Sequence, residues 1–149
     1  MPTLTLLVGI PACGKSTHAK KFADASIIIL SSDAIRKELL NDETNQKNNP
    51  IIFAELYKRA RNHLQNGLDV IIDATNISIF DRNRVLQNFT DMEIKRKAVV
   101  IQCPVEECIK RDSKRERSVG KDVIFRYARN YQPPTLDEGF DDVIFIENF

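Results

Sequence analysis

The sequence predicts an α/β fold in which a five-stranded parallel sheet carries helices on both faces. Apolar, β-branched runs alternate with amphipathic segments along the whole chain. A glycine-rich loop joins the first apolar run to the first amphipathic segment. At 149 residues the chain is long enough for one compact domain with a substantial core. We therefore expect a single domain over residues 1–149, with no internal repeat.

The expected strands are short, continuously apolar and rich in β-branched residues. This pattern is typical of strands that are buried on both faces of a parallel sheet. The predicted strands are 4–8, 26–30, 70–72, 98–101 and 143–146. Each is followed by polar or helix-forming residues, which places the carboxyl ends of the strands at one edge of the sheet.

The segments between these strands have apolar residues at helical spacing. The predicted helices cover 15–23, 33–40, 51–65 and 80–89, begin at 104, and cover 123–131. Pro104 suits a first helical position, because it has no backbone N–H to satisfy there. The stretch 41–49, NDETNQKNN, is polar and predicts a surface loop.

Charge and composition exclude several classes of protein. The 22 Lys and Arg residues nearly balance the 21 Asp and Glu residues, giving a formal net charge of +1, which argues against a broad basic surface for nucleic acid. No apolar run approaches the ~20 residues needed to span a bilayer, and residues 1–10 do not resemble a signal peptide. These features predict a cytoplasmic protein. The three cysteines and two histidines lack the spacing of a zinc site or a disulfide framework.

The segment 9–16, GIPACGKS, matches the phosphate-binding pattern G-x-x-x-x-G-K-[ST] between a strand and a helix. Its glycines allow a tight turn around phosphate oxygens, and its backbone N–H groups with the following helix supply positive potential. Lys15 can reach the outer phosphates and the Ser16 hydroxyl can bind Mg²⁺. The alternative is a glycine turn without a ligand. The residues expected to contact the nucleotide are Gly9, Ala12, Cys13, Gly14, Lys15, Ser16 and Thr17.

Asp33 and Arg36 follow the second expected strand and lie on one side of the next helix, because they are three positions apart. At the carboxyl edge of the sheet, a carboxylate can accept a proton from an attacking hydroxyl. Arg36 can hold an anionic group of the acceptor. The alternative is that Asp33, with Ser31 and Ser32, caps the helix.

Asp73 ends the third expected strand, in the run VIIDATN. A carboxylate at the end of a buried strand is costly unless it is hydrogen-bonded or near a metal. Asp73 is therefore a candidate for the Mg²⁺ shell, through water. The alternative is an ordinary strand-end turn made with Thr75 and Asn76.

The segment 110–121, KRDSKRERSVGK, carries six basic and two acidic residues. Arg111 and Arg115 lie four positions apart and can share one helix face, so they can close on an ATP phosphate as a lid over about 111–121. An arginine there would neutralise charge that develops during phosphoryl transfer. Arg117 is a lower-ranked candidate. The alternative is a solvated charged face.

The motifs together resemble the 5′-OH polynucleotide kinase family of P-loop phosphotransferases, and the kinase modules of bacterial RNA-repair polynucleotide kinase-phosphatases in particular. The similarity covers nearly the whole chain. It rests on GIPACGKST, SSDAIR, NDETNQ, VIIDATN and CIKRDSKRERS. The phage polynucleotide kinases are similar but carry the strand-end carboxylate directly before the Thr-Asn pair, where this chain has Ala74.

The resemblance implies a P-loop kinase fold and the use of ATP and Mg²⁺. It also implies roles for individual residues. Lys15 and Ser16 would serve the phosphates and Mg²⁺, and Asp33 would be the general base on a 5′-OH. Arg36 would orient the acceptor, while Arg111 and Arg115 would contact ATP from the lid.

The leading hypothesis is therefore a kinase that transfers the γ-phosphate of ATP to the 5′-OH end of RNA or DNA. One alternative keeps the fold and takes a small-molecule hydroxyl, such as that of a nucleoside, sugar or antibiotic, because fold does not determine function. Another is an ATP-binding module without phosphotransfer. The net charge is compatible with a nucleic-acid acceptor, because a kinase that grips only terminal nucleotides needs few cations.

Overall fold

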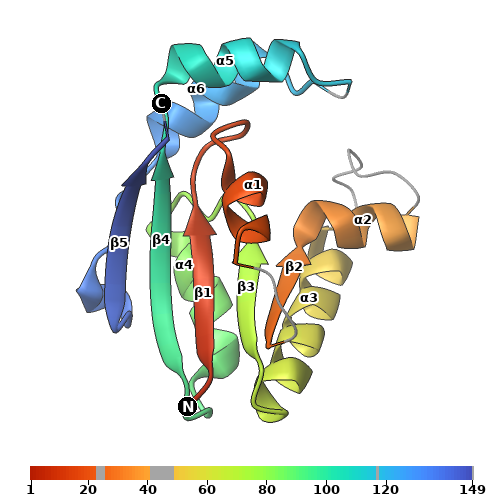
Figure 1. Cartoon of the computed structure of the whole chain (residues 1–149), viewed down its shortest axis with the longest axis vertical. Helices are drawn as coiled ribbons and strands as arrows, with labels where there is room; N and C mark the ends of the chain where they lie inside the picture. The colour runs from red at the N-terminus through yellow and green to blue at the C-terminus, as the bar shows by residue number, and fades with distance from the viewer. Residues whose placement is uncertain (23–25, 41–48, 117, 149) are drawn as a thin grey trace.

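The computed structural model describes residues 1–22, 26–40, 49–116 and 118–148. Its strands form one parallel sheet in the order β2-β3-β1-β4-β5 (Figure 1). The strands are β1 (Thr3–Val8), β2 (Ile27–Ser31), β3 (Asp69–Asp73), β4 (Lys95–Gln102) and β5 (Asp142–Glu147). The predicted five-stranded parallel sheet is confirmed.

Helices connect the strands, as the alternating pattern predicts. They are α1 (Lys15–Lys20), α2 (Ser32–Leu40), α3 (Asn49–Gln65), α4 (Ile79–Leu86), α5 (Val105–Ser113) and α6 (Lys121–Asn130). The 3-10 helices η1 (Gln87–Phe89) and η2 (Leu136–Glu138) complete the described elements. The first helix ends at Lys20, three positions short of the prediction. Residues 41–48 of the expected loop lie outside the described residues, and Asn49 already begins α3.

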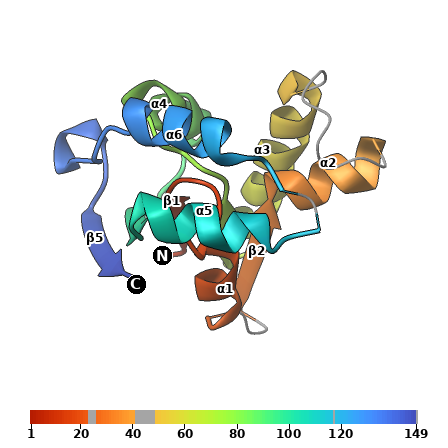
Figure 2. The ribbon, with the colours of Figure 1, turned by 90° about the horizontal axis from the view of Figure 1, so that it is seen from above.

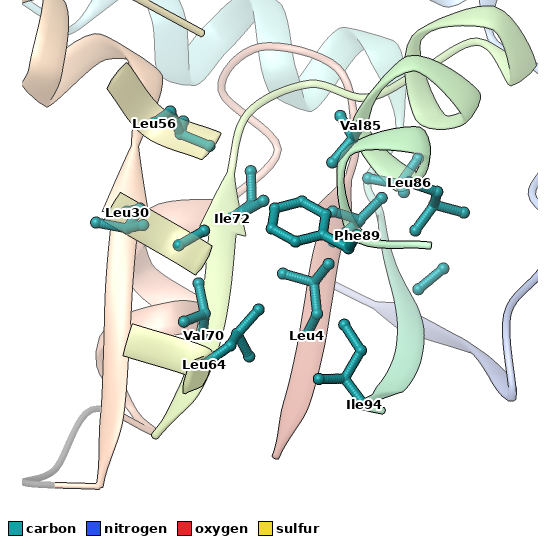
Figure 3. Close-up of a cluster of buried hydrophobic side chains, with 14 of the residues drawn as sticks. Leu4, Leu30, Leu56, Leu64, Val70, Ile72, Val85, Leu86, Phe89 and Ile94 are labelled. Atoms are coloured by element: carbon teal, nitrogen blue, oxygen red, sulfur yellow. The ribbon is translucent and has the colours of Figure 1, made fainter. Parts of the chain in front are cut away.

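Two hydrophobic layers cover the two faces of the sheet. In Figure 2, α3 and α4 lie on one face and α1 on the other. Alternate residues of β1 divide between these layers: Leu4 and Leu6 face the α3/α4 side, whereas Leu7 packs on the opposite side. Figure 3 shows Leu4 in the first layer with Leu64 and Phe89. The sheet is thus fixed from both faces, and its loops at the carboxyl edge are held in place by buried strands.

The fifth strand departs from the prediction of burial on both faces. Its Phe145 is 48% exposed and its Ile144 is 38% exposed. The physical reason is position, because β5 is an edge strand with β4 as its single neighbour in the sheet order. An apolar run in the sequence therefore indicated the strand correctly but overstated its burial.

The carboxyl edge of the sheet carries the loops that follow β1, β2 and β3. Figure 1 shows α5 and α6 lying across this edge, above the loop between β1 and α1. The basic segment predicted as a lid joins these two helices. The topology therefore brings the glycine-rich loop, the start of α2 and the basic segment to one side of the molecule.

None of the helices in the described ranges is both long and apolar enough to cross a membrane.

Candidate active site

The glycine-rich loop adopts two left-handed backbone conformations in the unit 9–16. Ala12 has φ 66° and Gly14 has φ 102°. A side chain at Gly9 would place its Cβ 2.5 Å from the Cys13 sulfur and 3.1 Å from the Ile101 carbonyl oxygen, so that position requires glycine. The Gly9 N–H donates to the Thr75 carbonyl at 3.0 Å, which ties the loop to the end of β3. The loop therefore has the tight, supported turn that phosphate binding needs.

The Lys15 ammonium lies inside this turn. Its Nζ donates to the carbonyl oxygens of Gly9 and Ile10, each at 2.9 Å. Both acceptors are neutral, so a phosphate oxygen would be a stronger partner for the same donor. Burial raises the pKa of the Cys13 thiol, although the nearby Lys15 ammonium opposes that shift. Cys13 is thus a packing residue with a protonated sulfur.

Ser16 and Asp73 meet across the carboxyl edge. The Ser16 hydroxyl donates to Asp73 Oδ2 at 2.6 Å, and Asp73 is 7% exposed. A buried carboxylate beside an exposed hydroxyl supplies the hard oxygen ligands that Mg²⁺ prefers. The residues present therefore fit a magnesium ion held next to the phosphates, as the sequence suggests. Their metal role stays a prediction.

The predicted acceptor pair lies at the start of α2. Asp33 Oδ1 accepts a hydrogen bond from Arg36 Nη1 at 2.7 Å, and the Ser31 hydroxyl accepts from the Ala34 N–H at the helix start. The Arg36 side chain is 4% exposed, whereas that of Asp33 is 66% exposed. A buried guanidinium thus holds an open carboxylate, which a hydroxyl-bearing molecule can approach from solvent.

The two lid arginines lie in different surroundings. Arg111, in the last turn of α5, reaches the glycine-rich loop, with Nη1 3.5 Å from the Cys13 carbonyl oxygen. Arg115 lies beyond the end of α5, about half exposed, with its nearest ion-pair partner Asp112 at 3.9 Å. The structure therefore brings Arg111 to the nucleotide loop and leaves Arg115 at the surface. Arg117 lies outside the described residues.

Asn148 is a contact of the loop that the sequence analysis missed. Its side-chain amide donates to the Cys13 carbonyl oxygen at 2.9 Å, and its backbone carbonyl accepts from Arg111 Nη2 at 3.4 Å. It follows β5 directly, so it ends a strand at the same edge as Asp73 does. The strand-end rule applied to Asp73 could have identified it.

A buried network behind the site also escaped the sequence analysis. The Asn76 amide donates to the Leu7 carbonyl oxygen at 2.9 Å, and the Asn76 carbonyl accepts from Arg82 Nη1. Arg82 is fully buried and pairs with Glu138 at 2.7 Å. These bonds fix the turn after β3, and with it Asp73, against β1 and η2.

The family comparison agrees with this arrangement. A family model described as an AAA domain, AAA_33, matches residues 4–134. The chain belongs to this AAA domain family. Members of this family have the P-loop kinase fold, and the resemblance to the polynucleotide kinase module of the RNA repair complex is confirmed.

Two similar proteins have 26% sequence identity to this chain. The L-seryl-tRNA(Sec) kinase of Methanococcus maripaludis is 26% identical over 150 residues, covering 93% of this chain and 56% of that protein. A chain of the Pnkp1/Rnl/Hen1 RNA repair complex superposes with a TM-score of 0.78 at 26% identity, covering 87% of this chain and 43% of that one. This chain therefore spans about half the length of these relatives.

A third comparison shows the fold alone. Chaetomium thermophilum Kti12 in complex with ADP-AlF3 superposes with a TM-score of 0.74 at 14% identity, covering 97% of this chain and 88% of that one. The AAA domain of the present chain thus shares its architecture with proteins of well-separated sequence. Activity and substrate have to be argued from the site.

Proposed function

We propose that this chain is an ATP- and Mg²⁺-dependent kinase that transfers the γ-phosphate of ATP to the 5′-OH end of a polynucleotide, RNA or DNA. The observation that carries the proposal is the Asp33–Arg36 pair at the same sheet edge as the phosphate loop. The similarity to a chain of an RNA repair complex and to a kinase of a tRNA supports a nucleic-acid acceptor. The single AAA domain over residues 1–149 would contain the whole phosphotransfer site.

The residues divide the work of transfer between donor and acceptor. Lys15, backbone N–H groups of the glycine-rich loop and Arg111 bind the ATP phosphates and stabilise the charge that spreads over the transferred group. The acceptor oxygen attacks the γ-phosphorus while the bond to the ADP oxygen breaks. Asp33 accepts the hydroxyl proton through its exposed carboxylate, and ADP leaves.

Arg36 acts on the geometry of this step. Its guanidinium is buried and bonded to Asp33, so it fixes the direction in which the carboxylate points. Its positive charge would also attract the terminal phosphodiester of the acceptor. Magnesium, when bound by Ser16 and through water by Asp73, would neutralise charge on the β- and γ-phosphates. Ser16 and Asp73 are joined by a hydrogen bond, so the two proposed magnesium ligands lie next to each other.

The test is transfer of label from γ-radiolabelled ATP to a panel of acceptors. The panel contains 5′-OH RNA and DNA oligonucleotides, their 5′-phosphorylated counterparts, nucleosides and sugars. We expect label on the 5′-OH oligonucleotides alone. Label on none of the oligonucleotides, with an active preparation shown by ATP binding, would overturn the proposal.

A small-molecule hydroxyl is the second candidate acceptor. The observation in its favour is the formal net charge of +1, which gives the chain no general attraction for a polyanion. In the same panel this function predicts label on a nucleoside or sugar and none on oligonucleotides. The two functions are therefore separated by one experiment.

A further inference from the structure

A groove between α3 and α4 is unaccounted for by the phosphotransfer site. It has a volume of about 590 Å³ and is lined by Phe53, Tyr57, Lys58, Arg61 and Arg84, among others. Among the described residues that line it, none is acidic. The groove therefore combines aromatic surface with three cations, of which Arg84 pairs with Asp81 at 3.6 Å and Arg61 pairs with Asp91, both just outside the lining.

The aromatic rings of the groove stand at two depths. Tyr57 lies nearer the core, because its ring packs in a T-shaped contact with the fully buried Phe89. The two ring centroids are 6.3 Å apart. Phe53 lies 6.0 Å from Tyr57, nearer the start of α3. Phe80, in the first turn of α4, is 72% exposed and lies beside Arg84, which lines the groove. Phe53 and Tyr57 are half-buried, so part of each ring is open to solvent.

Cations lie among these rings. The Arg84 guanidinium is 5.5 Å from the Phe53 ring centroid and 5.9 Å from that of Phe80, so it lies between them. Lys58 is exposed and makes no ion pair within the described part of the chain. Arg61 is held at the far end by the Asp91 carboxylate and the Asn88 carbonyl oxygen. Among the described cations of the groove, Lys58 is thus the one without an ion-pair partner.

The topology connects this groove to the acceptor site. α3 leads into β3 and α4 leaves it, so the first turns of both helices lie at the carboxyl edge of the sheet (Figures 1 and 2). Asp33 is the second residue of α2 and lies at that same edge. It follows β2, which is the neighbour of β3 in the sheet. From Pro50 to Arg61 the groove follows α3 for about 16 Å away from the edge. A strand whose end is at Asp33 can continue into it.

We propose that the α3/α4 groove binds the nucleotides that follow the reacting 5′ end of a single-stranded acceptor. Exposed rings stack on bases of any sequence, while Lys58 and Arg84 face the phosphodiester backbone. The inference rests on the proposed polynucleotide kinase function and adds to it a preference for longer acceptors.

The test compares acceptors of different length. Transfer of label to a 5′-OH dinucleotide and to a 5′-OH dodecanucleotide is measured for the wild type, Phe80→Ala and Lys58→Gln. The wild type should favour the dodecanucleotide in kcat/KM, and each groove variant should lower that ratio about tenfold. Matched controls are Phe145→Ala on β5 and Lys95→Gln at the start of β4, both exposed and away from the groove, which should keep the wild-type ratio.

Binding of a fluorescent single strand gives a second measurement that needs no catalysis. For Lys58→Gln, the slope of log affinity against log salt should be smaller by about 0.7, the value for one phosphate contact on a single strand. The groove proposal alone would be overturned if the wild type transfers label but both variants keep its kcat/KM ratio for the two acceptors, and Lys58→Gln keeps its salt slope. Absence of transfer and of strand binding in the wild type would overturn both proposals.

Discussion

Asp33 shows how one side chain can be both held and open. Its Oδ1 is fixed by the buried Arg36, whereas most of the carboxylate faces solvent. An exposed aspartate whose only task was stability would contribute little, because surface ion pairs are worth about 0–1 kcal/mol. The proposed role of Asp33 in proton transfer is compatible with this arrangement, in which the ion pair itself adds little stability.

Replacement of Asp33 by Asn should leave ATP affinity close to that of the wild type, because Asp33 lies on the acceptor side. Label transfer to a 5′-OH oligonucleotide should fall about 10²- to 10⁴-fold, the usual contribution of a general base. The control is Asp142→Asn, an exposed aspartate at the start of β5. Transfer at the wild-type rate by Asp33→Asn would remove Asp33 from the chemistry.

The proposed role of Lys15 differs from that of Asp33, because Lys15 is proposed to bind the phosphates of the donor. Replacement by Met preserves its length but removes the charge that a phosphate would meet. We expect weaker ATP binding and a loss of transfer of about 10²-fold or more, as when one preorganised donor to a transition state is removed. Equilibrium binding and single-turnover transfer check this, with the exposed Lys20 replaced by Met as the control. Normal ATP affinity in Lys15→Met would contradict the assignment.

At the scale of elements, the segment that joins α5 to α6 is organised by Asp112. This buried carboxylate accepts hydrogen bonds from the N–H groups of Val119 and Gly120 and from the Ser118 hydroxyl. Of the predicted lid arginines, Arg115 lies in this turn and Arg111 precedes it in α5. Asp112 therefore holds the start of α6 against the end of α5, and the sequence pattern did not distinguish it from its charged neighbours.

Asp112→Ala should lower the free energy of unfolding by about 3 kcal/mol, because two backbone N–H groups lose their acceptor in a buried setting. Urea unfolding measures this, with the exposed Glu116→Ala as the control. A loss no larger than that of Glu116→Ala would show that the turn is held by other contacts.

The same residue predicts a pH dependence. Burial by itself would raise the pKa of Asp112, but the hydrogen bonds from Val119, Gly120 and Ser118 outweigh it and hold that pKa below its usual range. A depressed folded-state pKa stabilises the protein above the unfolded pKa of about 3.9 and loses that effect as the pH falls. The difference in unfolding free energy between wild type and Asp112→Ala should therefore shrink below about pH 4. A difference that stayed constant down to pH 3 would contradict this.

The positions of helices and strands were predictable from the sequence where the spacing of apolar residues matches the burial of those residues in the structure. β4 shows where this agreement fails. The strand begins at Lys95, three residues before the predicted apolar run, because residues 95–97 pair with residues 3–5 of β1. Hydrogen bonding to a neighbouring strand extends a strand through polar residues, and no local pattern reports it. β5 shows the converse, since its apolar residues do not guarantee burial at an edge.

At the scale of the whole molecule, the site depends on contacts between residues far apart in the chain. The loop motif, Asp33, Arg36 and Asp73 were predictable, because each is local to a strand end or to a known spacing. The Asn148 bond to the loop and the Arg82–Glu138 pair join residues 135 and 56 positions apart. The position of Asn148 at a strand end is a sequence signal, but its bond to Cys13 and the Arg82–Glu138 pair depend on how the layers pack, which no local spacing reports.

Glu138→Ala tests whether this long-range pair supports the site. Arg82 is fully buried, so removal of Glu138 would leave its charge buried without that ion-pair partner. The free energy of unfolding should fall by about 3–5 kcal/mol. Thermal unfolding measures the loss, and the neighbouring exposed Asp137→Ala is the control. A shift equal to that of Asp137→Ala would show that the pair does not contribute to stability.

The central claim concerns where the γ-phosphate goes. Wild-type protein is incubated with γ-radiolabelled ATP, Mg²⁺ and a 5′-OH dodecanucleotide, and the product is digested to mononucleotides. The account predicts that all transferred label is recovered as the 5′-phosphate of the terminal nucleotide, and that Asp33→Asn transfers it at least about 10²-fold more slowly. Label that appears only as inorganic phosphate, or on a small hydroxyl compound in place of the oligonucleotide, would contradict it.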